Sequence, residues 1–171
     1  MSLIAKWLRP SPDPREAIRP LWHRVVEIAR EPEWYRDCGI ADTVAGRFDA
    51  ITLILSLVLI RMERDAAMAD ASVRLTELFV EDMDGQLRQG GVGDLIVGKH
   101  SGTLMSTLGG RLGAYRTALD EGEAATTAAV ARNMTLSDGA DPLLVAQRAR
   151  AFAAGLAATP AMRVLTAEIG R

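Results

Sequence analysis

One long aliphatic stretch constrains the fold of this chain more than any other feature. Between Ile51 and Ile60, inside the segment 46–64, the sequence is almost uninterrupted aliphatic. A helix with so little polar surface does not lie on the outside of a soluble domain. The stretch is also shorter than the about 20 apolar residues that a membrane-spanning helix needs. We therefore expect residues 46–64 to form a buried central helix, packed on several sides by other helices.

Composition indicates an ordinary globular protein. The chain has 171 residues, of which 49% are hydrophobic and 25% charged, and this length suits one domain. The formal net charge of −2 argues against a general nucleic-acid binder, which would carry a basic patch. Cys38 is the only cysteine, so an intrachain disulfide is excluded. With no recognisable signal peptide, we expect a cytoplasmic protein.

The first residues have a pattern of their own. On a helix, Leu3, Ile4, Trp7 and Leu8 would share one side, while Lys6 and Arg9 would lie elsewhere, and such a segment can lie on an anionic membrane surface. The alternative is a segment tucked against the domain or frayed. We divide the chain into residues 1–14, the amphipathic segment and a loop, and residues 15–171, a single helical domain.

The remaining periodicity predicts an all-α bundle of six to eight helices around the central one. Asp13-Pro14, Asp141-Pro142 and Thr159-Pro160 are typical helix starts. No alternating strand pattern with hairpin turns is present. We expect helices at about 15–30 with an interruption at Pro20, 31–37, 46–64, 71–89, 101–119, 121–133, 143–156 and 161–169. Gly109, Gly110 and Gly113 are expected to mark close contact between helices.

Enzymatic chemistry has little support in the sequence. His23 and His100 are far apart and stand in no metal-ligand pattern, and Cys38 has no catalytic motif around it. Glu77, Glu81 and Asp84 share a helix face but lack the Glu-x-x-His partners of carboxylate metal sites. We expect no catalytic residues, no metal and no cofactor. The alternative is a small helical ligand-binding protein or enzyme that holds haem or quinone in a pocket along the central helix.

A binding surface is the function that remains. Its candidate residues are those whose type packing alone does not readily explain, although capping, ion pairing or turn geometry could account for each. The aromatic pair 34–35 should place one ring inward and the other nearer the surface. The candidates are Trp34, Tyr35, Arg36, Asp37, Arg47, Phe48, Asp49, Asp82, Asp84, Val92, Asp94 and Lys99.

The same positions carry a family resemblance. The motifs are Glu-Trp-Tyr-Arg-Asp-Cys-Gly-Ile at 33–40, Asp-Thr-Val-Ala-Gly-Arg-Phe-Asp at 42–49, Phe-Val-Glu-Asp-Met-Asp at 79–84 and Leu-Arg-Gln-Gly-Gly-Val-Gly-Asp-Leu at 87–95. Together with Lys99, Gly110-Arg111 and Ala114-Tyr115, they resemble the ubiquinol–cytochrome c chaperone family in order and spacing. The resemblance covers about residues 21–119.

The resemblance implies a bacterial form of an assembly factor for the cytochrome bc1 complex. Mitochondrial members of the family bind newly made cytochrome b, with a small accessory protein, near the ribosome at the inner membrane. We therefore expect a non-catalytic chaperone that binds cytochrome b. A surface that combines Trp34 and Tyr35 with Asp82 and Asp84 is the hypothesis for its client site, and residues 1–9 are a candidate for peripheral membrane contact.

Overall fold

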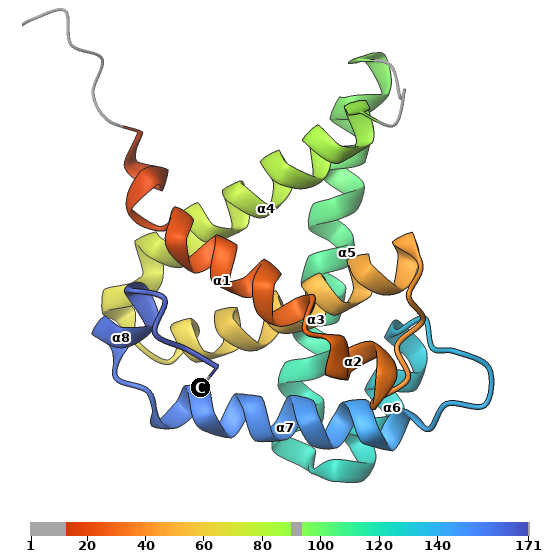
Figure 1. Ribbon diagram of the computed structural model, residues 1–171. Coiled ribbons are helices and arrows are strands. Elements are labelled where there is room, and N and C mark those ends of the chain that lie inside the picture. Colours follow the sequence, from red (N-terminus) through yellow and green to blue (C-terminus); the bar gives the residue numbers. More distant parts are fainter. Residues whose placement is uncertain (1–12, 90–93, 171) are drawn as a thin grey trace, which may run out of the picture.

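The aliphatic stretch forms α3 (Val44–Glu63), and the other helices are arranged around it (Figure 1). The computed structural model describes the backbone of residues 13–89 and 94–170, and their side chains except between positions 87 and 101. The all-α class is confirmed, and so is the expected number of helices, since the described residues hold α1 to α8. Their order is η2 (Pro14–Ala17), α1 (Arg19–Ala29), α2 (Pro32–Arg36), α3, η3 (Ala66–Met68), α4 (Ala69–Gln89), α5 (Asp94–Glu121), α6 (Glu123–Asn133), α7 (Pro142–Ala158) and α8 (Ala161–Leu165).

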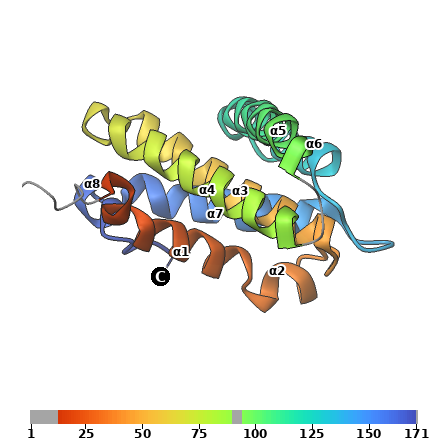
Figure 2. The same ribbon diagram turned by 90° about the horizontal axis from the view of Figure 1, so that it is seen from above.

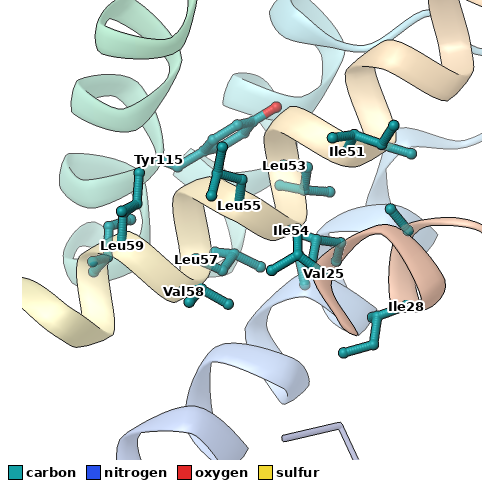
Figure 3. Packing of buried hydrophobic residues seen from close by; sticks show 14 of the residues in the cluster. Val25, Ile28, Ile51, Leu53, Ile54, Leu55, Leu57, Val58, Leu59 and Tyr115 are labelled. Carbon is teal, nitrogen blue, oxygen red and sulfur yellow. The ribbon is translucent and has the colours of Figure 1, made fainter. Parts of the chain in front are cut away.

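Helix α3 is buried because α1, α4, α5 and α7 all pack against it. Every residue from Asp49 to Ile60 is buried, and Figure 3 shows the aliphatic side chains pointing toward several neighbours. The hydroxyls of Thr52 and Ser56 donate to the carbonyl oxygens of Asp49 and Thr52 at 2.9 and 2.6 Å, so neither polar group is left unsatisfied. Each buried aliphatic side chain contributes about 1.5–3 kcal/mol. Among the described residues, no helix combines the length and apolarity needed to span a bilayer.

Side-chain caps begin α3 and α7, as well as the short turns η2 and η3. The Thr43 hydroxyl accepts a hydrogen bond from the backbone N–H of Gly46 at 3.1 Å, which begins α3. The Asp141 carboxylate accepts from the backbone N–H of Leu143 at 2.9 Å, with proline as the first residue of α7. The expected interruption at Pro20 is present as the boundary between η2 and α1.

Helices α4 and α5 lie close together at the end where one gives way to the other, and they diverge toward their opposite ends (Figures 1 and 2). Helix α5 buries Leu108, Tyr115 and Ala118. The expected contact at Gly109, Gly110 and Gly113 is wrong, because a Cβ added at any of them would meet no atom within 4 Å. Within the described part of the chain, these glycines face open space and not another helix.

The last third of the chain completes the core. Helix α7 packs on α3 and α6, and α6 packs on α5. Arg61 of α3 donates to the carbonyl oxygens of Leu156 and Thr159 at 3.0 and 2.9 Å, at the C-terminal end of α7. Arg24 of α1 donates to the carbonyl oxygen of Ile169 at 3.1 Å, which holds the described end of the chain against the first helix. Helix α8 ends at Leu165, earlier than expected.

Candidate partner-binding surface

Two glycines hold the segment between α2 and α3 in a tight path. Gly39 has a φ of +80°, and a Cβ there would meet the Cβ of Ala140 at 2.6 Å. A Cβ at Gly46 would overlap the carbonyl oxygen of Ala41, so only glycine lets this segment lie against the first turn of α3. This close approach places residues of α2 and the start of α3 on one surface.

The first feature of that surface is a groove of about 740 Å³ between the end of α1, α2 and the start of α3, which we call the arginine groove. Within it, the Tyr35 hydroxyl donates to the carbonyl oxygen of Ala29 at 2.8 Å. Burial and the negative charge of Asp42 raise the pKa of Tyr35, so the hydroxyl keeps its proton at neutral pH. The lining residues are Arg30, Pro32, Tyr35, Arg36, Ile40, Asp42, Arg47 and Ser137.

Two arginines of this groove, Arg36 and Arg47, form only solvent-exposed ion pairs. Arg36 Nε lies 2.7 Å from Asp37 Oδ1, and Arg47 Nε lies 2.6 Å from Asp42 Oδ1. These hydrogen bonds lower the pKa of both aspartates. An exposed ion pair contributes only about 0–1 kcal/mol, so either arginine can change partner at little cost. Arg30 is exposed, and its side chain makes no hydrogen bond or ion pair with the described residues.

The second feature is a groove of about 850 Å³ between α1 and α4, which we call the acidic groove. Both Asp82 and Asp84 are partly buried there, and Gln86 Nε2 lies 3.5 Å from Asp82 Oδ2, a long and weak hydrogen bond. Arg30 lines this groove as well, so the two grooves are adjacent. The lining residues are Arg19, Trp22, His23, Val26, Glu27, Arg30, Leu78, Glu81, Asp82, Asp84, Gly85 and Gln86.

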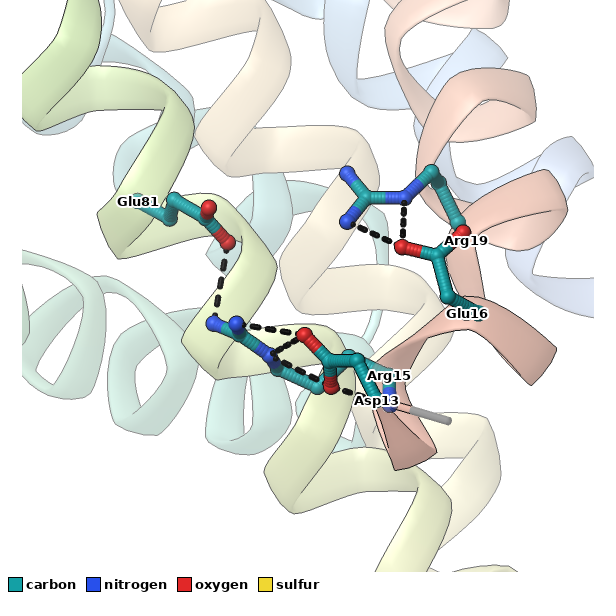
Figure 4. A network of polar contacts seen from close by, with 5 residues as sticks. All are labelled: Asp13, Arg15, Glu16, Arg19 and Glu81. Carbon is teal, nitrogen blue, oxygen red and sulfur yellow. Dashed lines mark hydrogen bonds and ion pairs between the residues drawn. The ribbon is translucent and has the colours of Figure 1, made fainter. Parts of the chain in front are cut away.

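A polar network joins η2, the turn before α1, to α4 at one end of the acidic groove (Figure 4). The Arg15 side chain donates three hydrogen bonds to the Asp13 carboxylate, and its Nη1 lies 2.9 Å from Glu81 Oε2. The hydrogen bonds from Arg15 lower the pKa of Asp13 to about 2. Arg19 pairs with Glu16 at 2.8 Å. Glu81 is thus engaged within the protein, while Asp82 lies further along the groove.

Trp34 was predicted to meet a client, but it is 2% exposed and faces inward. The Arg148 guanidinium lies 4.6 Å from the centroid of its ring and also pairs with Glu31 at 2.7 Å. Trp34 therefore packs α2 onto α7, and of the aromatic pair only Tyr35 reaches the groove. The expectation that one ring would pack inward is correct.

Asp49 and Phe48 also make their contacts inside the protein. Asp49 is 4% exposed, and its Oδ1 lies 2.6 Å from Arg111 Nη2. Its Oδ2 accepts hydrogen bonds from the backbone N–H and the hydroxyl of Thr135 at 2.8 and 2.7 Å. Phe48 is partly buried, with its ring centroid 6.3 Å from that of Phe79 and 5.4 Å from the Arg111 guanidinium carbon. A direct contact between Asp49 and a partner does not fit this burial.

The other predicted residues either lie at one of the two grooves or fall outside the described part of the chain. Tyr35, Arg36 and Arg47 line the arginine groove, with Asp37 paired to Arg36 beside it, while Asp82 and Asp84 line the acidic groove. Val92 and the side chains of Asp94 and Lys99 lie outside the described part of the chain.

Comparison with known proteins identifies the family. The family model described as ubiquinol-cytochrome C chaperone matches residues 36–169. The chain belongs to this family. Membership supports a role in assembly of the bc1 complex. The crystal structure of the Cbp3 homolog from Brucella abortus is similar, with a TM-score of 0.80 and 26% identity over 91% of this chain and 88% of that chain. Among curated proteins, no match was found.

The family match begins later and extends further than the sequence motifs indicated. We placed the resemblance at about residues 21–119, whereas the match runs to residue 169 and so includes α6 and α7 of this chaperone. The reason lies in packing: α7 contributes to the core around α3, and Thr135, in the segment before it, holds Asp49.

Sequence reasoning missed three arginines of this chaperone that matter to the site. Arg30 lines both grooves, Arg111 pairs with Asp49, and Arg148 covers Trp34. Arg111 stands in a motif that we quoted, so its partner was a signal that could have been sought. Arg30 and Arg148 lie in segments of ordinary amphipathic pattern, where arginine on a helix surface calls for no explanation.

Proposed function

We propose that this protein is a non-catalytic assembly chaperone that binds cytochrome b, newly made or immature, and supports assembly of the bc1 complex. The observation that carries the proposal beyond family membership is the convergence of motif residues. Tyr35, Arg36 and Arg47 line one groove, Asp82 and Asp84 line the next, and Arg30 belongs to both. We propose these two adjacent grooves as the client-binding surface.

Charge and exposure suggest how such a surface would work. Cytochrome b is a helical membrane protein that presents apolar segments and charged loops before its partners are in place. Groups around Asp82 would attract basic loop residues, while Arg30 would attract acidic ones, and such complementarity speeds encounter and sets register. Because the Arg36 and Arg47 pairs are exposed, their guanidinium groups can turn to client carboxylates at little cost in stability.

Recovery of cytochrome b from solubilised membranes tests the proposal. The variant Arg30→Glu with Arg47→Glu reverses the charge of the arginine groove without touching the core, and we expect cytochrome b recovery to fall at least fivefold. Arg132→Glu is the matched control, because Arg132 is exposed on α6 and lines neither groove. Unchanged recovery with the double variant, at wild-type helix content, contradicts the arginine groove as a client site.

The acidic groove is tested in the same assay. Tyr35→Ala combined with Asp82→Ala changes one residue from each groove, and we expect a loss of recovery larger than that of Tyr35→Ala alone. Equal recovery for the single and combined variants would restrict the client site to the arginine groove. In cells, deletion of the gene should lower the amount of assembled bc1 complex, and an unchanged amount would contradict the assembly role itself.

Finer expectations stay predictions. They are a small accessory protein or the ribosome as a further partner, membrane contact through residues 1–9, and the division at residue 14. An absorption spectrum of the purified protein tests the alternative in which a pocket along α3 holds haem or quinone. A Soret band that co-purifies with the protein at a stoichiometric level would contradict a cofactor-free chaperone.

A further inference from the structure

A third groove lies between α4 and α5 above α3, and Glu81 is the one lining residue that it shares with the acidic groove. It measures about 640 Å³, and we call it the α4–α5 groove. Leu59 of α3 lies among its lining residues, with Val73 and Val80 from α4 and Met105 and Leu112 from α5. Val73 is 59% exposed and Met105 46% exposed. Large apolar side chains exposed side by side in a groove are typical of a docking site.

The edge of this groove is acidic. Three carboxylates, those of Glu63, Glu77 and Glu81, line it together with one guanidinium, that of Arg15. Glu81 pairs with Arg15 at 2.9 Å and Glu63 with Arg116 at 2.7 Å, whereas Glu77 makes no hydrogen bond or ion pair with the described residues. An occupant that matches this groove therefore has an apolar side and positive charges next to it.

The first residues of this chain have that chemistry. Leu3, Ile4, Trp7 and Leu8 would share one side of a helix, and Lys6 and Arg9 carry positive charge. The described chain begins at Asp13, and Arg15, only two residues further on, already lines the groove. The segment is thus attached at the edge of the groove.

The length of the segment suits the groove. The α4 wall between Ser72 and Glu81 is about 14 Å long at 1.5 Å per helical residue. A helix of residues 1–9 has about the same length. Residues 10–12 can bridge up to about 10 Å when extended, which is enough to bring the segment from its attachment point into the groove.

We propose that residues 1–9 dock in the α4–α5 groove of the same chain. Leu3, Ile4, Trp7 and Leu8 cover the exposed apolar residues, and Lys6 or Arg9 pairs with Glu77. Tethering favours this occupant over a second copy or a separate protein, because a short linker gives an effective concentration in the millimolar range. The inference concerns the free protein and holds whether or not the client is cytochrome b. Since one apolar side cannot cover the groove and lie on a membrane at once, the docked and membrane-bound states exclude each other.

Disulfide trapping in the full chain tests the docking. In a Cys38→Ser background, Leu8→Cys with Val73→Cys places one thiol in the segment and one on the groove wall. The matched control is Leu8→Cys with Leu144→Cys, because Leu144 is 45% exposed but stands at the start of α7 and does not line the groove. We expect the first pair to form an intramolecular disulfide at least tenfold faster than the control under mild oxidation.

Equal rates for the two pairs overturn the proposal, and so does a disulfide-linked product of twice the chain mass, which would make a second copy the occupant. A third variant tests the charge argument separately. Adding Glu77→Lys to the first pair should slow trapping at least threefold, while helix content by circular dichroism stays unchanged. Anionic phospholipid vesicles should also slow it, and trapping that is indifferent to both changes would contradict docking through this face of the segment.

Discussion

Two ion pairs near the start of α3 have the same length and opposite surroundings. Arg47 Nε lies 2.6 Å from Asp42 Oδ1, and these side chains are 60% and 62% exposed. Arg111 Nη2 lies 2.6 Å from Asp49 Oδ1, and these side chains are 15% and 6% exposed. An exposed pair contributes about 0–1 kcal/mol, whereas breaking a buried pair costs about 3–5 kcal/mol. Burial, and not distance, decides which pair maintains the fold and which is available to a partner.

The contrast follows from helix geometry. Successive residues of an α-helix are about 100° apart, so Arg47 and Asp49 point to nearly opposite sides of α3. Arg47 therefore reaches the arginine groove, while Asp49 turns toward α5 and the segment around Thr135. One short family motif thus serves two purposes, and substitutions in it should separate stability from partner binding.

The largest effect is expected for Asp49→Ala. It leaves Arg111 buried without its anion and removes the acceptor for Thr135, so the free energy of unfolding should fall by about 3–5 kcal/mol. Chemical denaturation with circular dichroism measures it. The control is Asp49→Leu with Arg111→Met, which removes both charges and should recover much of the loss. A fall below about 1 kcal/mol for Asp49→Ala would mean that the pair is not buried in solution.

A smaller loss of stability is expected for Gly46→Ala, in the first turn of α3. The new Cβ would overlap the Ala41 carbonyl oxygen, so the segment after α2 must shift, at a cost of about 1–3 kcal/mol. Gly109→Ala is the matched control, because a Cβ there meets nothing and alanine favours a helix by about 1 kcal/mol. We expect the midpoint temperature of thermal unfolding to fall for Gly46→Ala and to rise for Gly109→Ala. Shifts in the same direction would contradict the tight turn.

The buried surroundings of the Arg111–Asp49 pair can also be tested through Tyr115, by the pH dependence of protein stability. Burial raises its pKa, with a further rise from Asp49 that Arg111 opposes, and its hydroxyl has no hydrogen-bond partner among the described residues. A raised pKa means that the stability contribution is complete below the unfolded pKa of about 10 and is lost as pH rises above it. Tyr115→Phe should therefore make stability depend less on pH between about pH 9 and 11.

At neutral pH the same substitution should change the free energy of unfolding by less than about 1 kcal/mol, because no hydrogen bond is lost. Tyr35→Phe gives the matched contrast, since its hydroxyl donates to the Ala29 carbonyl oxygen at 2.8 Å, and it should lose about 0.5–1.5 kcal/mol. Urea titrations at neutral pH and between about pH 9 and 11 measure these differences in the free energy of unfolding. An equal loss at neutral pH for the two variants would show that the Tyr115 hydroxyl is hydrogen-bonded.

The smallest effect on stability is expected for Arg47→Ala. Its pair with Asp42 is exposed, so the free energy of unfolding should change by less than about 0.5 kcal/mol, while cytochrome b recovery falls severalfold. Denaturation and pull-down on the same preparation separate the two readouts. A stability loss comparable to that of Asp49→Ala would remove the distinction between the two ion pairs.

Much of the fold could be predicted because its signals are local. The aliphatic run predicted residues 46–64 as a buried helix, and α3 runs from Val44 to Glu63. Leu75, Phe79 and Met83 recur every four residues along α4, and all three are buried. The prediction of helix contact at the glycines of α5 was wrong. A small residue marks such a contact only where another helix lies, and none of the described helices covers that side of α5.

The candidate surface was less predictable. The motif marked residues 34–37 and 47–49 as a group, but it did not show that Trp34 and Asp49 face inward while Tyr35 and Arg47 face a groove. That separation depends on α7 and on the segment around Thr135, about a hundred residues further along the chain. Arg30 carries no motif and became part of the surface only through the arrangement of α1 beside α2 and α4.

By itself, the sequence determined the all-α class, the central helix, the helix start at Asp141-Pro142 and the family motifs, because each depends on neighbouring residues and their hydrogen-bonding or hydrophobic pattern. The start of α5 was not among them, because the helix expected from about residue 101 begins at Asp94. The tertiary structure alone decided which motif residues are buried, which arginine meets which carboxylate, and where grooves open between helices. Those outcomes depend on packing between distant segments: Asp49 and Arg111 are far apart in the chain and meet only because α5 lies against α3. Local chemistry specifies the elements, and long-range contact specifies the surface that they present.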